Sequence, residues 1–182
     1  IAELPGEPTV LVANLPYNVS VPVLLHFLES FPYLQRGVVM VQAEVGERLA
    51  APPGSKTYGA PSAKAAWYGR WWLAGTVSRQ VFWPVPNVGS VLVAFERAPE
   101  PRGTEDERRA AFRLVDAAFQ QRRKMLRQAL AGVLRESAPD GGADSISAAD
   151  ASALLERAGV APTARGEELT IDDFARIADS LR

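Results

Sequence analysis

An amide, a proline and an aromatic ring stand close together in the tetrapeptide Asn14-Leu15-Pro16-Tyr17, where binding chemistry is first expected along the chain. The tetrapeptide directly follows Val10–Ala13, a short apolar run with the β-branched content of a buried strand. Ser20 and Pro22 come next, and they suit the cap and the first turn of a helix. The tetrapeptide is therefore predicted at the carboxyl end of a strand, the edge at which open α/β sheets bind ligands.

These residue types suit a planar group that carries an amine. The side-chain oxygen of Asn14 and a backbone carbonyl that Pro16 helps to orient can accept hydrogen bonds from an –NH2 group. The ring of Tyr17 can stack on the face of the same group. An ordinary turn formed by Asn and Pro is the alternative interpretation of these four residues taken alone.

Three later segments join the tetrapeptide in a set of four blocks. They are Gln42-Ala43-Glu44-Val45 with Arg48 and Gly54-Ser55-Lys56-Thr57-Tyr58-Gly59; Phe82-Trp83-Pro84-Val85-Pro86-Asn87-Val88-Gly89-Ser90; and Phe119-Gln120-Gln121-Arg122-Arg123-Lys124. In this order the blocks resemble the ribosomal RNA adenine dimethyltransferase family, and the resemblance covers nearly the whole chain, from Val10 to about Ile177. Leu15, the Gly-Ser-Lys-x-Tyr-Gly block and the Gln-Arg-Arg-Lys block favour its small-subunit members.

The resemblance implies a function. S-adenosylmethionine would supply methyl groups to the exocyclic amines of two adjacent adenines near the 3′ end of small-subunit ribosomal RNA, in the 30S assembly particle. The expected enzyme is a cytoplasmic monomer with no membrane partner. One alternative is the macrolide-resistance family, which methylates an adenine of the large-subunit RNA and has an Asn-Ile-Pro-Tyr/Phe-type motif. A non-catalytic RNA- or ribosome-binding module with the same fold is the other.

The resemblance also assigns catalytic residues, namely Asn14, Leu15, Pro16, Tyr17 and Phe82. Asn14 Oδ1 and the carbonyl of Leu15 would accept hydrogen bonds from the adenine amine and aim its lone pair at the methyl group. Tyr17 and Phe82 would stack on the base, which is presented out of its helix. Asn14 is also expected to contact the cofactor.

The aromatic pair Phe82-Trp83 admits two interpretations. Taken alone, both rings would pack at the end of a strand. With the Phe-x-Pro-x-Pro loop and Ser90 beside it, Phe82 is predicted to stack on the base, whereas Trp83 is predicted to pack. The turn Gly54-Ser55-Lys56 follows a helix and lacks the upstream glycine of a Gly-x4-Gly-Lys-Ser/Thr loop, which excludes nucleotide-phosphate binding there.

The charge distribution bears on RNA binding. The net charge of −1 is unusual for a nucleic-acid-binding protein, but between Arg108 and Arg135 eight basic residues stand against one acid. Contact with RNA phosphates is predicted for Arg122, Arg123, Lys124 and Arg127. A solvated helix face is one alternative for this cluster, and pairing with acids of the catalytic domain, to fix the domain interface, is another.

The predicted fold class is α/β. Residues 1–98 are expected to form part of a Rossmann-like methyltransferase domain, with strands at 10–13, 38–41, 72–77 and 91–96 and helices from about 21, at 44–50 and at 63–69. The last two strands lie too close in sequence for a crossover helix, which predicts an antiparallel hairpin. After a linker at 98–103, residues 99–182 are expected to form a small all-α, RNA-contacting domain.

Capping boxes mark the helices of this second domain. They are Thr104 with Glu107, Ser147 with Asp150, and Thr170 with Asp173. Between the first two, the apolar stripe from Met125 to Leu134 predicts one further helix. Gly159 suits the end of the helix that begins after Ser147.

The cofactor site is expected to be partial. Only thirteen residues precede Asn14, with no Gly-x-Gly turn among them, so most of the S-adenosylmethionine site of the family would lie outside this chain. The 182-residue chain contains no cysteine, which excludes disulfides and thiolate metal sites. No metal site is predicted, and no apolar stretch reaches the roughly 20 residues of a membrane span.

Overall fold

The computed structural model describes residues 6–136 and 147–182. The chain divides into two compact units, Ile1–Pro52 with Ala65–Arg102, and Pro53–Lys64 with Gly103–Arg182. No helix in the described part of the chain is long and apolar enough to cross a membrane.

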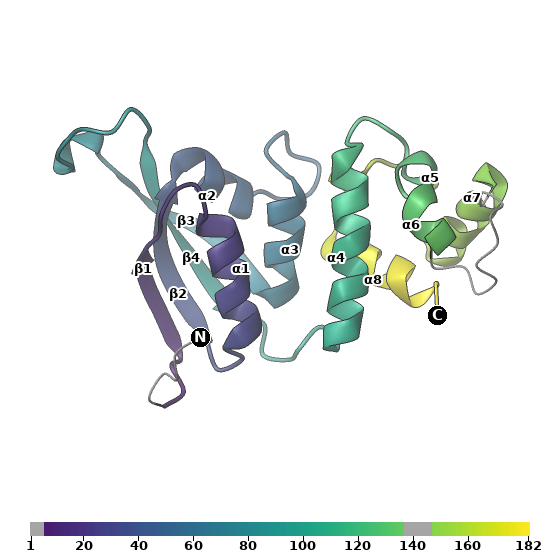
Figure 1. The fold of residues 1–182 in the computed structure, drawn as a ribbon, viewed down its shortest axis with the longest axis horizontal. Helices are drawn as coiled ribbons and strands as arrows, with labels where there is room; N and C mark the ends of the chain where they lie inside the picture. The colour runs from purple at the N-terminus through teal and green to yellow at the C-terminus, as the bar shows by residue number, and fades with distance from the viewer. Residues whose placement is uncertain (1–5, 137–146) are drawn as a thin grey trace. The chain divides into compact units, whose positions relative to one another are not determined.

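A four-stranded sheet forms the centre of the first unit (Figure 1). Its strands are β1 (Val10–Asn14), β2 (Arg36–Gln42), β3 (Gly69–Val77) and β4 (Ser90–Arg97), in the order β1-β2-β4-β3. β1 and β2 run parallel, and β4 is antiparallel to both β2 and β3. The antiparallel pairing predicted for the last two strands is therefore confirmed. Helices α1 (Ser20–Ser30) and α2 (Ala43–Leu49) follow β1 and β2.

One face of this sheet is buried under helices. The inward residues of β2 and β4 include Val39, Val41 and Val93, all fully buried. Gly46 of α2 lies so close to the sheet that a Cβ atom there would overlap the methyl groups of Val91 and Val93. The absence of a side chain at Gly46 thus lets α2 approach the strands that hold the site edge.

The other face of the sheet is open. Val12, Val38, Ala94 and Trp72 form one row across all four strands, and Val12 is 79% exposed. Because side chains alternate along a strand, Asn14 points to the same open face as Val12. The amide predicted to bind the ligand is accordingly exposed.

The second unit is helical. Its elements are α4 (Glu105–Gln120), α5 (Leu126–Ala129), α6 (Ala131–Glu136), α7 (Ala148–Arg157), the short 3₁₀ helix η2 (Gly166–Glu168) and α8 (Ile171–Asp179). All three predicted capping boxes are present, at the starts of α4, α7 and α8. Gly159 follows α7 with a φ of +72°, a left-handed conformation that glycine adopts without strain.

The prediction of a single helix between Met125 and Leu134 is wrong. The structure has two short helices, α5 and α6, separated at Leu130. The apolar stripe itself is retained, because Leu126, Ala129, Leu130 and Leu134 are all buried. The spacing of apolar residues predicts which face is buried. It does not reveal a break in the helix when the same residues stay buried on both sides of the break.

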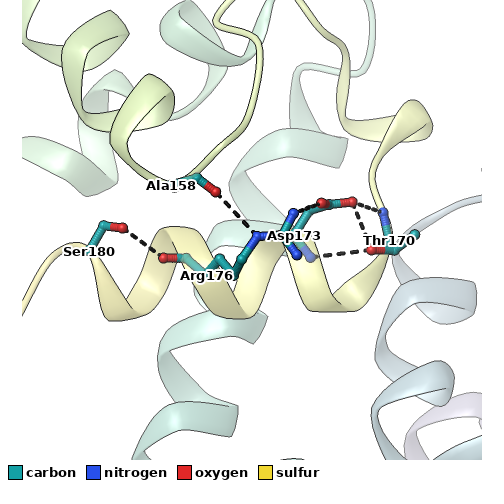
Figure 2. A network of polar contacts seen from close by, with 5 residues as sticks. All are labelled: Ala158, Thr170, Asp173, Arg176 and Ser180. Carbon is teal, nitrogen blue, oxygen red and sulfur yellow. Dashed lines mark hydrogen bonds and ion pairs between the residues drawn. The ribbon is translucent and has the colours of Figure 1, made fainter.

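A polar network joins the start of α8 to the end of α7 (Figure 2). The backbone N–H and the hydroxyl of Thr170 both donate to Asp173 Oδ2, each at 2.7 Å. Arg176 forms an ion pair with Asp173 and donates through Nε to the carbonyl of Ala158 at 3.2 Å. The capping box therefore also orients an arginine that ties the two helices together.

Helix α3 (Ala60–Tyr68) crosses from one unit to the other, and it begins three residues earlier than expected. The segment before it, 53–59, was expected in the first domain but packs with the helical unit. The Gly54 N–H donates to the carbonyl of Glu167 at 2.7 Å, and the Tyr58 hydroxyl donates to the carbonyl of Leu169 at 2.8 Å. These bonds join positions more than a hundred residues apart.

Candidate active site

Residues of the first three of the four sequence blocks meet at one edge of the sheet. In the strand register Asn14 is paired with Met40, at the carboxyl ends of β1 and β2. At the same edge Ser90, which begins β4, is paired with Val77 and with Gln42. The loop after Asn14 and the loop that contains Phe82 therefore emerge from the same edge, as the position of the tetrapeptide predicted.

The tetrapeptide is anchored through its backbone. The Leu15 N–H donates to the carbonyl of Met40 at 3.1 Å, and the side chain of Leu15 is only 6% exposed. The Val19 N–H donates to the carbonyl of Pro16 at 3.3 Å, which closes a turn before α1. Leu15 thus fixes the path of the chain while Pro16 and Asn14 remain exposed.

The two acceptors proposed for the amine are available. Within residues 6–136 and 147–182, neither the side chain of Asn14 nor the carbonyl of Leu15 forms a hydrogen bond. Both groups are attached to a backbone segment that the hydrogen bond of the Leu15 N–H and the buried Leu15 side chain hold in place. Preorganised acceptors of this kind can be satisfied by a ligand without first breaking an internal bond.

Tyr17 contacts the third block, Phe82–Ser90, through a hydrogen bond. Its hydroxyl lies 2.5 Å from Ser90 Oγ, and Ser90 is only 3% exposed. The Ser20 hydroxyl donates to the carbonyl of Tyr17 at 3.2 Å, so Ser20 supports the loop instead of capping α1, where Val19 stands at the N-cap. Ser90 ends the third block, and the sequence alone did not assign it to the site.

We expect Tyr17→Phe to destabilise the protein by about 1–3 kcal/mol, because it leaves the buried Ser90 hydroxyl without its partner. Ser90→Ala should cost less, since the half-buried Tyr17 hydroxyl can turn to water. Urea denaturation of both variants and of the double variant measures the coupling. Strictly additive effects would show that the contact contributes nothing.

Phe82 lies in the loop between β3 and β4. It directly follows the 3₁₀ helix η1 (Arg79–Val81), and its N–H donates to the carbonyl of Arg79 at 3.3 Å. Arg79 Nη1 also reaches the carbonyl of Asn87 at 3.4 Å, which joins the two arms of the loop. Phe82 is half-buried, and among the described residues its ring does not stack on that of Tyr17, so each ring keeps a face for a base.

The packing role predicted for Trp83 is wrong. Its side chain is 95% exposed. It belongs to the loop 78–89 between β3 and β4, which projects beyond the sheet in Figure 1. Apolar character alone therefore overstated its burial.

The basic cluster lies in the helical unit, in the turn after α4. Arg122 Nε donates to Glu167 Oε2 at 2.7 Å, and Arg122 Nη2 donates to the carbonyl of Lys56 at 2.9 Å. Arg123 and Lys124 are exposed and form no ion pair with a described residue. Arg122 therefore has an intramolecular role, and its acidic partner belongs to the helical unit, not to the first unit as the interface alternative assumed.

The described residues contain no group of three or more His, Cys, Asp or Glu side chains that could hold a metal ion. The predicted site residues at the sheet edge supply hydrogen-bond acceptors, at Asn14 and Leu15, and aromatic rings, at Tyr17 and Phe82. It can hold and orient a planar amine, and none of these side chains is a strong acid or base.

The family model for ribosomal RNA adenine dimethylases matches residues 3–181. The chain therefore belongs to the ribosomal RNA adenine dimethylase family, as its four blocks predicted. The match runs through both units.

Curated relatives agree with this assignment. A ribosomal RNA small subunit methyltransferase A from Leifsonia xyli subsp. xyli is 63% identical over 178 residues, which cover 98% of this chain and 60% of the relative. The protein of that name from Streptomyces coelicolor is 57% identical over 180 residues, which cover 98% of this chain and 59% of the relative. The chain thus spans about 60% of the length of these relatives.

Two solved structures share the fold. A dimethyladenosine transferase from Plasmodium falciparum superposes with a TM-score of 0.80 at 22% identity, over 97% of this chain and 68% of that one. The 23S rRNA methyltransferase ErmE superposes with a TM-score of 0.66 at 21% identity, over 99% of this chain and 68% of that one. The likeness confirms the predicted fold class, a Rossmann-like methyltransferase fold.

Proposed function

We propose that this chain is part of an S-adenosylmethionine-dependent enzyme that dimethylates adenines of small-subunit ribosomal RNA. The observation that carries the proposal is the pair of unengaged acceptors, Asn14 Oδ1 and the Leu15 carbonyl, at the carboxyl end of β1. The name shared by relatives at 53–63% identity supports the choice of the small-subunit RNA.

The residues present fit one side of a cofactor and substrate site. S-adenosylmethionine, when bound, supplies a methyl group on a sulfonium centre, so no strong acid or base is required of the protein. Asn14 Oδ1 and the Leu15 carbonyl accept hydrogen bonds from the two N–H groups of the adenine amine. These bonds hold the nitrogen with its lone pair directed away from the acceptors, toward the methyl donor. Asn14 is the described residue proposed to contact the cofactor.

Tyr17 and Phe82 hold the base itself. Stacking contributes about 1–3 kcal/mol per base, and a base reaches such a pocket only when it leaves its helix. The bond from Tyr17 to Ser90 fixes one of the two rings before the base arrives. Pro16 restricts the backbone that presents the Leu15 carbonyl.

The proposed substrate is the RNA of the 30S assembly particle, met in the cytoplasm by a monomeric enzyme. Arg123, Lys124 and Arg127 contact its phosphates from the helical unit. The large-subunit RNA is the less favoured substrate, because the relatives at 53–63% identity are named for the small subunit.

An enzyme of the relatives' full length that carries this sequence tests the proposal. It is incubated with unmethylated 30S particles and, separately, with 50S particles, in the presence of methyl-labelled S-adenosylmethionine. We expect label on adjacent adenines near the 3′ end of the small-subunit RNA. Label confined to large-subunit RNA, or binding without any label, would overturn the assignment in favour of the two alternatives respectively.

Variants of the basic cluster distinguish contact with RNA phosphates from an intramolecular, stabilising role. Arg123→Ala with Lys124→Ala should lower the slope of log affinity against log salt by about 1.5, because two phosphate contacts are lost. The melting temperature should stay unchanged, since neither side chain is paired within the described chain.

Arg122→Ala should instead lower the melting temperature by about 3 °C, since it breaks a partly exposed ion pair. Filter binding to 30S particles and a thermal melt on each variant give both quantities. A lower melting temperature for the double variant with an unchanged slope would reject the RNA assignment.

A further inference from the structure

The loop between β3 and β4, residues 78–89, exposes apolar side chains next to the candidate site. Val81 is 69% exposed, Trp83 is 95% exposed and Val85 is 54% exposed. Trp83 is the largest of the three, and among the described residues it forms neither a hydrogen bond nor a ring contact. Arg79 is the one charged residue of the loop, so the loop has no acidic group that would repel a polyanion. Exposed apolar side chains that gather on one loop mark a surface for interaction.

Backbone constraints hold this loop in shape around Trp83. Arg79 Nη1 donates to the carbonyl of Asn87 at 3.4 Å, which joins the arm before Trp83 to the arm after it. The Ala43 N–H donates to the carbonyl of Gly89 at 2.9 Å, which fixes the end of the loop to the start of α2. The two prolines that follow Trp83 restrict φ at their own positions. The ring is therefore presented by an ordered loop, and a partner that binds it has little further chain to immobilise.

Trp83 is the direct neighbour of Phe82, the ring proposed to stack on the adenine. Their Cα atoms are about 3.8 Å apart, as in any trans-linked pair of residues. Phe82 is half-buried, whereas Trp83 is exposed, so one short segment holds one ring against the fold and offers the other to the solvent. An adenine that enters the site leaves its helix, and the bases on either side of it lose a stacking partner. A second aromatic ring next to the site can replace that lost stacking.

We propose that Trp83 stacks on the nucleobase next to the adenine that Tyr17 and Phe82 hold. The inference rests on the proposed function and adds a positioning residue to it. Trp83 touches no reacting atom, but it holds the strand from which the adenine is extruded. Every base has a flat face, so this contact is tolerant of sequence. In an RNA with two adjacent target adenines, the neighbour on one side is the other target.

A base is favoured over an apolar protein surface or a lipid because of what surrounds Trp83. Burial against an apolar surface stabilises in proportion to the area removed from water, so Val81 and Val85 would contribute together with the indole ring. Stacking on a base uses the flat ring alone. The position directly after Phe82 places this ring beside the nucleotide that the site is proposed to bind, and this adjacency favours RNA.

The test uses an enzyme of the relatives' full length that carries this sequence, with unmethylated 30S particles as substrate. Trp83→Ala removes the ring, Trp83→Tyr keeps a flat ring, and Trp83→Leu keeps only apolar volume. Val85→Ala is the matched control, since Val85 is an exposed apolar residue two positions further along the same loop. The kcat/KM for methylation and the melting temperature are measured for each protein.

We expect Trp83→Ala to lower kcat/KM by about 5- to 150-fold, the loss that follows when stacking on one base is removed. Trp83→Tyr should keep most of the activity, Trp83→Leu should resemble Trp83→Ala, and Val85→Ala should stay within about twofold of the parent. Melting temperatures should match the parent, because the side chain of Trp83 is exposed. Activity of Trp83→Ala equal to that of the parent would overturn the inference. Equal losses in Trp83→Ala and Val85→Ala, with recovery in Trp83→Leu, would also overturn it and show that the loop docks on an apolar surface.

A second measurement identifies the base that the ring contacts. Particles are assembled with RNA whose synthetic 3′ segment has an abasic site directly before or directly after the methylated adenine. On one of these two RNAs the parent should lose as much activity as Trp83→Ala loses on the intact RNA, and the variant should lose nothing further, because the two changes remove the same contact. A constant ratio of parent to variant activity on all three RNAs would overturn the inference and leave the proposed function intact. A parent that methylates no adenine of the intact particle would instead reject the proposed function.

Discussion

Asn14→Ala is expected to lower turnover by on the order of 100-fold while the affinity for RNA stays close to that of the parent. The Asn14 oxygen accepts a hydrogen bond from an amine nitrogen whose charge grows as the methyl group transfers. An interaction that strengthens in the transition state affects kcat more than binding, and removal of one such preorganised group costs about 10²–10³ in kcat. Single-turnover methylation and filter binding on the same preparation separate the two effects.

Asn18→Ala is the matched control, since Asn18 is an exposed asparagine four residues along the same loop and forms no hydrogen bond with a described residue. It should methylate at the rate of the parent. Asn14→Ala should also melt at the same temperature as the parent, because the Asn14 side chain has no partner in the described ranges. Turnover of Asn14→Ala within twofold of the parent would remove Asn14 from the mechanism.

The site was predictable where its determinants are local. A short apolar run followed by Asn14–Tyr17 and a helix-capping region places the tetrapeptide at a strand end, and the structure has β1 end at Asn14. The capping boxes were predictable for the same reason, since a residue pair such as Thr104 with Glu107 is separated by only one helical turn. In both cases the residues that determine the local structure are also near neighbours along the sequence.

Long-range contacts left no comparable signal. Tyr17 and Ser90 are 73 positions apart, and nothing in either residue type indicates that their hydroxyls meet. Arg122 was interpreted as one of several equivalent cations, whereas its bonds to Glu167 and Lys56 depend on a chain path that sequence spacing does not specify. The placement of 53–59 with the helical unit follows from such bonds as well.

Side-chain burial was the other property that the sequence did not predict reliably. Trp83 is apolar and next to a strand, yet a loop of twelve residues between Val77 and Ser90 carries it away from the sheet. Phe82, one residue earlier, keeps half of its surface covered because it follows η1, whose first residue bonds across the loop. Adjacent aromatic residues can therefore differ in burial when the backbone turns between them.

Phe82→Ala is expected to lower kcat/KM for methylation by about 5- to 150-fold, the equivalent of the 1–3 kcal/mol that stacking on one base contributes. Phe82→Leu should recover part of the loss, because leucine restores apolar contact but offers no flat ring. The measurement is methylation of 30S particles at substrate concentrations below KM, with a thermal melt on each variant.

Val81→Ala is the control, since Val81 is a 69% exposed apolar neighbour of Phe82 in the same loop and its change should leave kcat/KM within about twofold of the parent.

Stacking and packing predict different patterns for the Phe82 variants. If the ring packs, Phe82→Ala lowers the melting temperature and Phe82→Leu restores both stability and activity. If the ring stacks on the base, melting temperatures change little, because the ring is only half-buried, and activity falls in the order Phe, Leu, Ala. Full activity of Phe82→Ala would show that this ring does not hold the adenine and would leave Tyr17 as the only stacking residue proposed at the site.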